Sequence, residues 1–288
     1  MKRVAIIGLG LIGGSLGLAL KGWADWERVG FARRVEVATK AVSSGAVDSA
    51  ESDLVSAVKD ASLVIIATPP MTVKDIVVQI WEHLRPGCVV TDTASTKAQI
   101  VTWAQELLPP WIHFIGGHPM AGKETSGIDA ADAKLFHDGI YCLVSGKTSS
   151  PQAMELMQAL VKQIGACPVV LGAAEHDKLV AGISHLPLLL SAALVSTTTK
   201  SPLWPQMAQL AAGGFRDLSR LASGSPEMSR DICLTNKGPL LQWLDEFTKE
   251  LAEFRRLINN DYKELEQAFI LARQRREEWL FGIPAEGV

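Results

Sequence analysis

A glycine-rich turn near the start of the chain constrains the fold more than any other feature. Residues 4–7 form a short apolar run, and Gly8-Leu9-Gly10-Leu11-Ile12-Gly13 follows it directly and opens a helical pattern that continues to about residue 21. In such a strand–turn–helix unit the first glycine permits the tight turn, the second admits a pyrophosphate, and the third lets the helix pack on the strand. The free N–H groups at the helix start would face the phosphates. A glycine turn without a ligand is the alternative, but the flanking strand and helix favour a dinucleotide site. We expect its contacts to come from Gly8, Gly10, Leu11, Ile12 and Gly13.

Further strand-like runs alternate with helical patterns as far as residue 171. They cover residues 29–31, 63–67, 88–92, 111–115, 141–144 and 168–171. This alternation predicts an α/β fold with a mostly parallel, doubly wound sheet. From residue 173 onward the strand-like runs stop and apolar residues follow helical spacing, interrupted at Asn259-Asn260-Asp261. We therefore expect a Rossmann-type domain over residues 1–171 and an all-helical domain over residues 172–288.

The composition argues against several other classes of protein. A formal net charge of −3 gives no reason to expect nucleic acid or an anionic membrane as a partner. The four cysteines are scattered and lie at no metal-ligand spacing, which favours a reducing compartment and argues against a disulfide frame or a metal site. Residues 4–20 are apolar, but glycines interrupt them, which argues against a signal peptide or a membrane span. Residues 179–195 are also apolar, but they contain His185 and Pro187 and are interpreted as a buried helix. We expect a cytoplasmic protein.

The end of the second predicted strand bears on which nucleotide binds. A site for NAD would place Asp or Glu about 20 residues after the glycine motif, to bind the ribose 2′-hydroxyl. Here the chain continues from the strand into Ala32-Arg33-Arg34, whose guanidinium groups suit a 2′-phosphate. An exposed basic loop is the alternative. The sequence favours NADP over NAD, with Arg33 and Arg34 as ligands, and the strand that ends at Thr68-Pro69 is expected to meet the same cofactor.

His118 is the candidate catalytic residue. It lies in Gly116-Gly117-His118-Pro119-Met120-Ala121-Gly122, where the proline favours an extended conformation at the histidine and the glycines let main chain approach a ligand. An imidazole held in this way can act as a general base near neutral pH. Ser95 follows the predicted strand 88–92, at the edge where the nicotinamide of a doubly wound fold sits. It could hydrogen-bond substrate and cofactor, or it could be only the N-cap of the next helix.

Two arginines in the predicted helical domain are candidate substrate ligands. Arg216 and Arg220 lie one helical turn apart in Gly213-Gly214-Phe215-Arg216-Asp217-Leu218-Ser219-Arg220. Two guanidinium groups so placed can bind a carboxylate, and surface salt bridges, for instance with Asp217, are the alternative.

Taken together, these segments resemble the prephenate/arogenate dehydrogenase family of tyrosine biosynthesis. The resemblance is carried, in the family's order, by the glycine turn, by Asp92-Thr93-Ala94-Ser95-Thr96-Lys97, Gly117-His118-Pro119-Met120-Ala121-Gly122, Ser184-His185-Leu186-Pro187 and Gly214-Phe215-Arg216-Asp217-Leu218-Ser219-Arg220. It implies an NADP-binding domain followed by an all-helical dimerisation domain, and hence a homodimer. It also implies the oxidative decarboxylation of arogenate to tyrosine, or of prephenate to 4-hydroxyphenylpyruvate.

The same resemblance implies a role for each candidate residue. His118 would accept the proton of the substrate's 4-hydroxyl as hydride leaves the same carbon, and Ser95 would hold that hydroxyl and the nicotinamide in register. Arg220 would bind the side-chain carboxylate with Arg216 in support. Glu124 and Asp217 are candidate gate or amine-binding carboxylates.

The chain departs from the family pattern at one informative position. Many relatives read Ser-His-Leu-Pro-His, whereas this segment ends in Leu188. The missing imidazole, together with Glu124 and Asp217, which could meet an ammonium group, favours arogenate over prephenate. One alternative is another two-domain NADP oxidoreductase, of the β-hydroxyacid dehydrogenase or imine reductase type. Such an enzyme would need a catalytic lysine on a helix, or a different acid, in place of His118. A second is a non-catalytic NADP-sensing protein, in which His118 could be replaced without loss of function.

Overall fold

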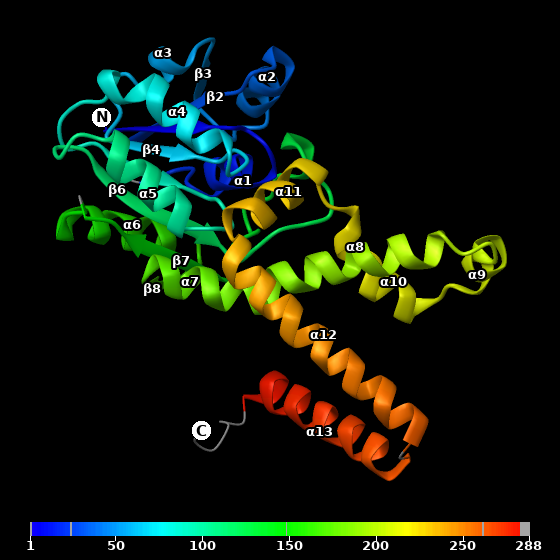
Figure 1. Ribbon diagram of the computed structural model, residues 1–288. Helices are drawn as coiled ribbons and strands as arrows, with labels where there is room; N and C mark the ends of the chain where they lie inside the picture. The colour runs from blue at the N-terminus through cyan, green and yellow to red at the C-terminus, as the bar shows by residue number, and fades with distance from the viewer. Residues whose placement is uncertain (1, 24, 148, 261, 283–288) are drawn as a thin grey trace. The chain divides into compact units, whose positions relative to one another are not determined.

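An eight-stranded sheet forms the centre of the N-terminal part of the protein (Figure 1). The computed structural model describes residues 2–282 except residues 24, 148 and 261. Every neighbouring pair of strands in the sheet is parallel except β6 and β7, and the strand order is β3-β2-β1-β4-β5-β6-β7-β8. The mostly parallel sheet is therefore confirmed. The strands are β1 (Lys2–Ile7), β2 (Trp26–Phe31), β3 (Ser49–Glu51), β4 (Leu63–Ile66), β5 (Val89–Asp92), β6 (His113–Pro119), β7 (Ile140–Ser145) and β8 (Cys167–Leu171).

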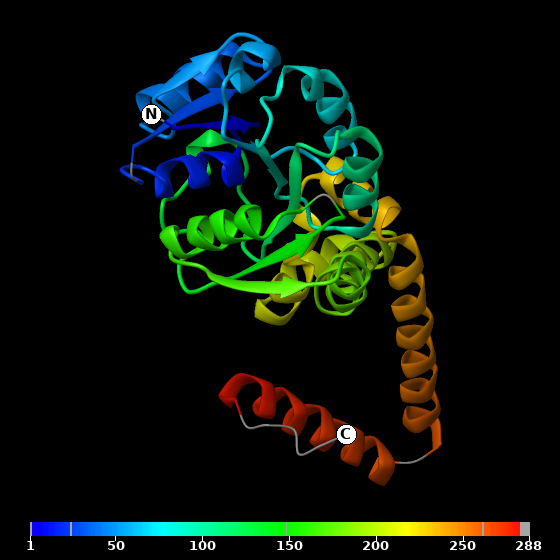
Figure 2. The same cartoon turned by 90° about the vertical axis from the view of Figure 1, so that its left-hand side faces the viewer.

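Helices cover both faces of the sheet (Figure 2). Val4 and Ile6 of β1 belong to one buried core and Ala5 and Ile7 to another, because successive side chains of a strand point to opposite faces. Burial on both faces explains why the first strand reads as a continuous apolar run. The helices of this part are α1 (Leu11–Ala19), α2 (Val35–Ser43), α3 (Leu54–Val58), α4 (Thr72–Ile80), α5 (Ala98–Leu107) and α6 (Pro151–Gln163), with 3₁₀ turns at Trp81–His83 and Ile128–Ala130.

Two strands differ from the sequence-based expectation. β3 was not predicted from the sequence, because it has only three residues. It is an edge strand of the sheet and, among the described residues, pairs only with β2. The strand expected over residues 111–115 instead runs over His113–Pro119, because its second half pairs antiparallel with β7 and places His118 opposite Cys142. The extended conformation expected at His118 is thus part of the sheet.

Beyond β8 the structure describes only helices. They are α7 (Ala173–Val180), a π-helical turn (Ala181–His185), α8 (Leu186–Thr199), α9 (Trp204–Leu210), α10 (Gly213–Ser219), a 3₁₀ turn (Arg220–Ser223), α11 (Pro226–Thr235), α12 (Lys237–Asn260) and α13 (Tyr262–Phe281). The expected change from α/β to all-helical structure is confirmed. The boundary between residues 171 and 172 stays a prediction, since the chain packs into two compact units that divide elsewhere, Met1–Leu240 and Leu241–Val288.

The long apolar helical segment Ala173–Thr199 differs from the expectation of a buried helix. By length and composition it could cross a membrane, with a mean hydropathy of 1.9 over 18 residues, and only 28% of that window is buried within this chain. His185 is fully buried, whereas Ile183 is 73% exposed. The expectation of burial over residues 179–195 is therefore wrong for a single chain, because one side of the segment has no cover from the residues described.

The C-terminal unit, Leu241–Val288, contains most of α12 and all of α13. The rings of Phe254 in α12 and Phe269 in α13 lie 5.5 Å apart, which is a common aromatic packing distance. An interruption was expected at Asn259-Asn260-Asp261, but α12 continues through Asn260 and α13 begins at Tyr262, while Asp261 lies outside the described residues.

Candidate active site

The glycine turn has the geometry that a pyrophosphate requires. Gly8 has a φ of +96°, and a Cβ atom there would lie 2.5 Å from the carbonyl oxygen of Ala67. A Cβ on Gly13 would lie 1.9 Å from the carbonyl oxygen of Gly8, so the helix can pack this closely only with glycine at that position. Among the residues described, a Cβ on Gly10 would meet no atom within 4 Å, and no side chain caps the start of α1. The turn therefore leaves open space over unpaired N–H groups at a helix start, which fits a bound anion.

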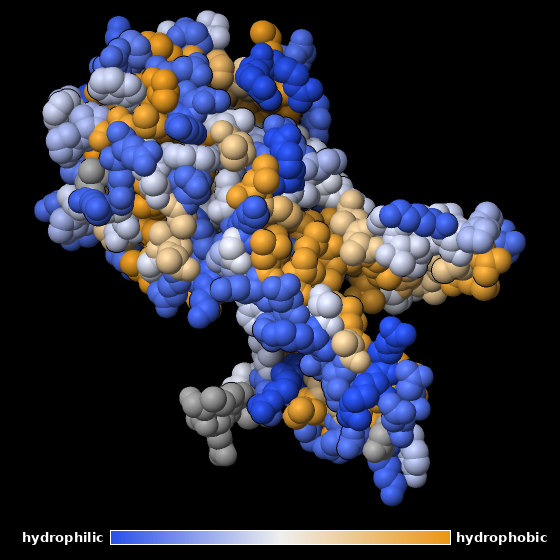
Figure 3. Space-filling model, in the orientation of Figure 1, coloured by the Kyte–Doolittle hydropathy of each residue, from blue (hydrophilic) through white to orange (hydrophobic). Residues whose placement is uncertain are grey.

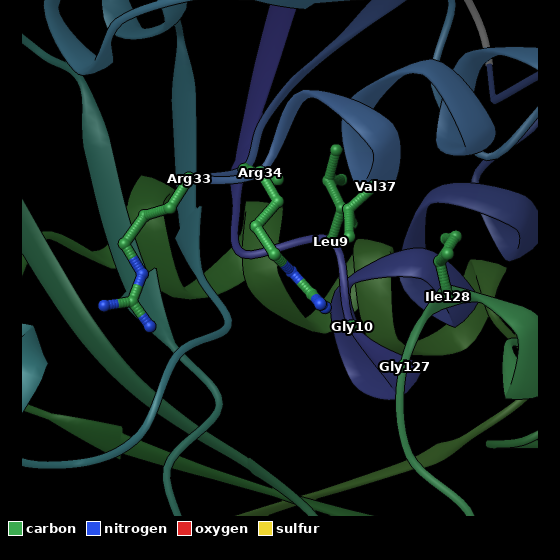
Figure 4. A pocket seen from close by; sticks show the side chains of 8 residues that line it. Leu9, Gly10, Arg33, Arg34, Val37, Gly127 and Ile128 are labelled. Atoms are coloured by element: carbon green, nitrogen blue, oxygen red, sulfur yellow. The ribbon is translucent and has the colours of Figure 1, made fainter.

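Two cavities flank this turn. The first, of about 420 Å³, is lined by Leu9, Gly10, Ala32, Arg33, Arg34, Val37, Gly127 and Ile128 (Figure 4). In this view the guanidinium of Arg34 points toward Gly10, while Arg33 points the other way. Gly8, Arg33, Thr68 and Pro69 line the second cavity. The structure thus brings six of the nine expected cofactor residues to two neighbouring cavities, whereas Leu11, Ile12 and Gly13 lie in the first turn of α1 and line neither.

A buried ion pair supports the loop that follows β5. The ammonium group of Lys97 donates to Oδ2 of Asp92, and both side chains are fully buried. Oδ1 of Asp92 also accepts from the main-chain N–H of Gly117 at 3.2 Å, which ties β5 to β6 one residue before His118. Burial lowers the pKa of Lys97, and the attraction of Asp92 opposes that shift. Removing one partner would leave an uncompensated buried charge, so the pair fixes the geometry of the loop.

His118 ends a buried chain of three side chains that links the sheet to α7. Its Nδ1 atom lies 2.8 Å from Nε2 of His176, and Nδ1 of His176 lies 2.8 Å from Oδ1 of Asp177. His118 is 6% exposed, His176 0% and Asp177 2%. Burial lowers the pKa of His118 well below its usual value, and His176, Lys97 and His185 act in the same direction. His118 is therefore neutral at neutral pH, as a general base must be.

Asp177 has a second task that settles one alternative for Ser95. Its carboxylate accepts from the main-chain N–H groups of Lys97 at 2.7 Å and Ala98 at 2.8 Å, so it caps α5 from another part of the chain. The N-cap position is Lys97, and the interpretation of Ser95 as a helix cap is wrong. The half-buried hydroxyl of Ser95 makes no hydrogen bond within the described part of the chain.

A third buried histidine, His185, lies in the π-helical turn. Nδ1 of His185 lies 3.0 Å from the amide nitrogen of Asn236, while its buried Nε2 has no hydrogen-bond partner among the residues described. Burial lowers the pKa of His185 to about 4. π-helical turns occur often at functional sites, and this one holds a neutral imidazole inside the helical layer.

The expected substrate carboxylate ligands are near the surface. Arg220 donates to the Glu124 carboxylate across 96 residues of sequence, and the two side chains are 58% and 43% exposed. The main-chain N–H of Glu124 and then the Arg220 guanidinium lower the pKa of the Glu124 carboxyl. Arg216 and Asp217 are exposed, and their side chains make no ion pair within the described residues. The structure thus joins Arg220 with Glu124 and leaves the other two apart.

His176 and Asp177 were not predicted from the sequence. They stand in Glu175-His176-Asp177-Lys178, a charged run at a helix start that is typical of a solvated face. The structure buries the middle two residues between α7 and the sheet. The one feature of the sequence that could have indicated a functional role is that this histidine and carboxylate lie close to the predicted domain boundary at residues 171 and 172.

Models of one protein family match both parts of the chain. Residues 16–170 match the family described as prephenate dehydrogenase, nucleotide-binding domain, and residues 172–271 match prephenate dehydrogenase, dimerization domain. The prephenate dehydrogenase of Bacillus subtilis (strain 168) is 38% identical over 281 residues, which is 95% of this chain and 75% of that protein. The cyclohexadienyl dehydrogenase of Zymomonas mobilis is 32% identical, over 89% of this chain and 88% of that protein.

Solved structures show the same similarity. The Synechocystis arogenate dehydrogenase superposes with a TM-score of 0.81 and 32% identity, over 96% of this chain and 99% of that one. The prephenate dehydrogenase of Aquifex aeolicus, in complex with hydroxyphenyl propionate and NAD+, gives a TM-score of 0.89 and 27% identity, over 96% and 98% of the two chains.

Proposed function

Because the chain belongs to the prephenate dehydrogenase family, we propose that it catalyses the NADP-dependent oxidative decarboxylation of arogenate to tyrosine. The observation that carries the proposal is the neutral, nearly buried imidazole of His118, which the sheet, the Asp92–Lys97 ion pair and His176 hold in place. No catalytic metal or covalent nucleophile is required by this chemistry, so one base and a set of positioning groups suffice.

Each residue has one task in the proposed reaction. His118 takes the proton of the 4-hydroxyl group, and the Ser95 hydroxyl holds the same oxygen. A bound nicotinamide supplies the acceptor for the hydride that leaves the 4-carbon. That carbon becomes a conjugated ketone, which withdraws electrons from the ring carboxylate, so CO₂ leaves and the ring becomes aromatic. Arg220 binds the side-chain carboxylate, which then competes with Glu124 for the guanidinium.

The choice of NADP rests on the end of β2. Arg33 and Arg34 line the cavity beside Gly10, and the first residues after the strand include no carboxylate that would repel a 2′-phosphate. The open space over Gly10 fits the pyrophosphate of either nucleotide. The NAD+ complex of the Aquifex aeolicus relative shows that a protein of this fold binds the unphosphorylated cofactor, so the choice needs a direct test.

The choice of arogenate rests on the side-chain end of the substrate. Leu188 stands where many relatives have histidine, and Glu124, which already contacts Arg220, could pair with an ammonium group. Prephenate is the second candidate, favoured by the 38% identity to a Bacillus subtilis protein named for that substrate.

Steady-state kinetics with both substrates and both cofactors test the proposal. We expect the highest kcat/KM for arogenate with NADP. A higher kcat/KM for prephenate, or for NAD, would overturn that part of the assignment while leaving the reaction class intact. No turnover of either dienol, with NADP binding intact, would contradict the proposed function as a whole.

We also propose a cytoplasmic homodimer, with the helical domain as its interface. Large apolar side chains along α7–α10 are exposed in the single chain, and Figure 3 shows apolar surface along α8 and α10. They include Leu179, Ile183, Leu210 and Leu218, of which Leu210 is 83% exposed. A second copy would cover such a surface, and the matched family is described as a dimerization domain. Sedimentation equilibrium without detergent should give twice the chain mass, and a monomer at micromolar concentration would contradict the proposal.

A further inference from the structure

The hydrogen bonds of Asp177 determine where the protons of its neighbours lie. Its carboxylate accepts from two main-chain N–H groups, those of Lys97 and Ala98, and main-chain N–H groups can only donate. The third contact, from Oδ1 to Nδ1 of His176 at 2.8 Å, must therefore also be donated to the carboxylate. A lone pair on Nδ1 of His176 would face an anionic oxygen at that distance without a proton between them. Nδ1 of His176 thus carries a proton.

The position of the proton on His176 determines the position of the proton on His118. In a neutral imidazole with the proton on Nδ1, the other nitrogen is an acceptor, so Nε2 of His176 accepts at 2.8 Å from Nδ1 of His118. A neutral His118 with its proton on Nδ1 has its lone pair on Nε2. Nδ1 makes the hydrogen bond to His176, and no described residue hydrogen-bonds Nε2, so Nε2 keeps its lone pair.

We propose that His176 and Asp177 are positioning residues that hold His118 in the tautomer whose basic nitrogen is Nε2, and that they stabilise the imidazolium formed when Nε2 takes up a proton. The identity of the proton donor, the hydroxyl of a dienol, rests on the proposed function, whereas the tautomer does not. In the reaction the O–H bond breaks, its proton forms a bond to Nε2, and the hydride leaves for the nicotinamide.

The charges around His118 explain why such support is needed. Lys97 after β5, His176 in α7 and His185 in the π-helical turn all act on the ring electrostatically, and none of these side chains can carry a negative charge. Cys142 lies opposite on β7. The Asp177 carboxylate reaches His118 through the hydrogen bonds of His176, whereas the Asp92 carboxylate is paired with Lys97. Without His176, an imidazolium at His118 would be buried near the Lys97 ammonium group and would lose its hydrogen-bonded link to the Asp177 carboxylate.

Nitrogen NMR of the whole protein tests the tautomers without any substrate. The chain has only six histidines, so ¹⁵N-histidine labelling gives a spectrum that single His→Gln variants can assign. At neutral pH we expect both His118 and His176 to be protonated on Nδ1 alone. A spectrum in which His118 carries its proton on Nε2, or in which His176 is doubly protonated, would overturn the inference.

Two substitutions at the middle residue test the catalytic consequence. Gln in place of His176 can present an amide oxygen to Nδ1 of His118, whereas Leu cannot. We expect His176→Leu to lower kcat about 10–100-fold, less than the 10²–10⁴-fold typical for a general base itself, with KM little changed. His176→Gln should recover most of the loss. Equal kcat values in both variants, whether normal or equally low, would contradict the proposal that His176 fixes the tautomer of His118. His176 would then contribute only to the packing of α7.

The surface offers a matched control. His137 and Asp138 are also neighbours in sequence and joined Nδ1 to Oδ2 at 3.0 Å, but their side chains are 62% and 90% exposed. His137→Leu should leave kcat and the NMR signals of His118 unchanged. The two proposals also fail separately. If the NMR spectra show the expected tautomers but the protein oxidises neither dienol, only the proposed function is contradicted. If the protein oxidises a dienol but His118 carries its proton on Nε2, only this inference is contradicted.

Discussion

Replacing either of two glycines in the same turn by alanine should have different effects: at Gly10 the added methyl group should weaken cofactor binding, and at Gly13 it should lower the stability of the fold. At Gly10 a Cβ meets no atom within 4 Å, and the backbone, with φ −88° and ψ −155°, is extended, a conformation that alanine adopts. Gly10→Ala should therefore leave the folded protein intact, and it could gain up to about 1 kcal/mol because the unfolded chain loses freedom. The methyl group would instead fill the space where the cofactor's pyrophosphate approaches the start of α1.

The expected loss is one of binding. If the methyl group prevents one charge-assisted hydrogen bond to phosphate, the cost is about 1.5–3 kcal/mol, or a Kd raised about 10- to 150-fold. Gly13→Ala is the matched variant. Its Cβ would lie 1.9 Å from the Gly8 carbonyl oxygen, so helix and turn would have to separate. Overpacking of this kind costs about 1–3 kcal/mol, which lowers the melting temperature by roughly 2–12 °C.

Thermal melts of the cofactor-free proteins and NADPH fluorescence titrations measure the two effects. We expect Gly10→Ala to melt within about 2 °C of the parent protein and to bind NADPH at least about tenfold more weakly. If Gly10→Ala binds NADPH normally, or melts as early as Gly13→Ala, then the open space over Gly10 is not where the pyrophosphate binds.

Three further predictions concern the cofactor, the substrate and pH. Arg33→Asp and Arg34→Asp should each weaken NADP binding by more than about tenfold and NAD binding much less, since a charge-assisted hydrogen bond is lost only with the 2′-phosphate; equal losses in calorimetric titrations would defeat the NADP assignment. Arg220→Ala should raise KM for the substrate with little change in melting temperature, because its ion pair with Glu124 is exposed, and an unchanged KM would remove Arg220 from the substrate site. Burial lowers the pKa of His185 to about 4, below the ordinary value of about 6.5. Unfolding therefore takes up a proton between these values, and the free energy of unfolding should fall as pH decreases through that window, by at most about 1.4 kcal/mol per pH unit for this group. Urea titrations at pH 7 and pH 5 should show a smaller fall in His185→Leu, and an identical fall would contradict the prediction.

Features encoded in short stretches of sequence could be predicted. The glycine turn, the end of β2 and the histidine before Pro119 each depend on a few consecutive residues, whose backbone preferences act locally. β3 was missed because three residues, Ser49–Glu51, give too short a pattern, and their extended conformation comes from pairing with β2.

Contacts between distant residues could not be predicted. His118 and His176 are 58 residues apart in the chain, and Glu124 and Arg220 are 96 apart. The cap of α5 shows the reason. A serine three residues before a helix suggests a local cap, yet the fold supplies the Asp177 carboxylate from 80 residues away, and no local pattern carries that information.

The turnover of a His118→Asn variant tests the central claim most directly. The measurement is kcat for the preferred dienol with saturating cofactor, alongside a titration showing that NADPH binding is unchanged. Loss of the base should lower kcat on the order of 10²–10⁴-fold. Near-normal turnover by a variant that still folds and binds NADPH would contradict the assignment of His118 as the proton acceptor, and with it the proposed mechanism.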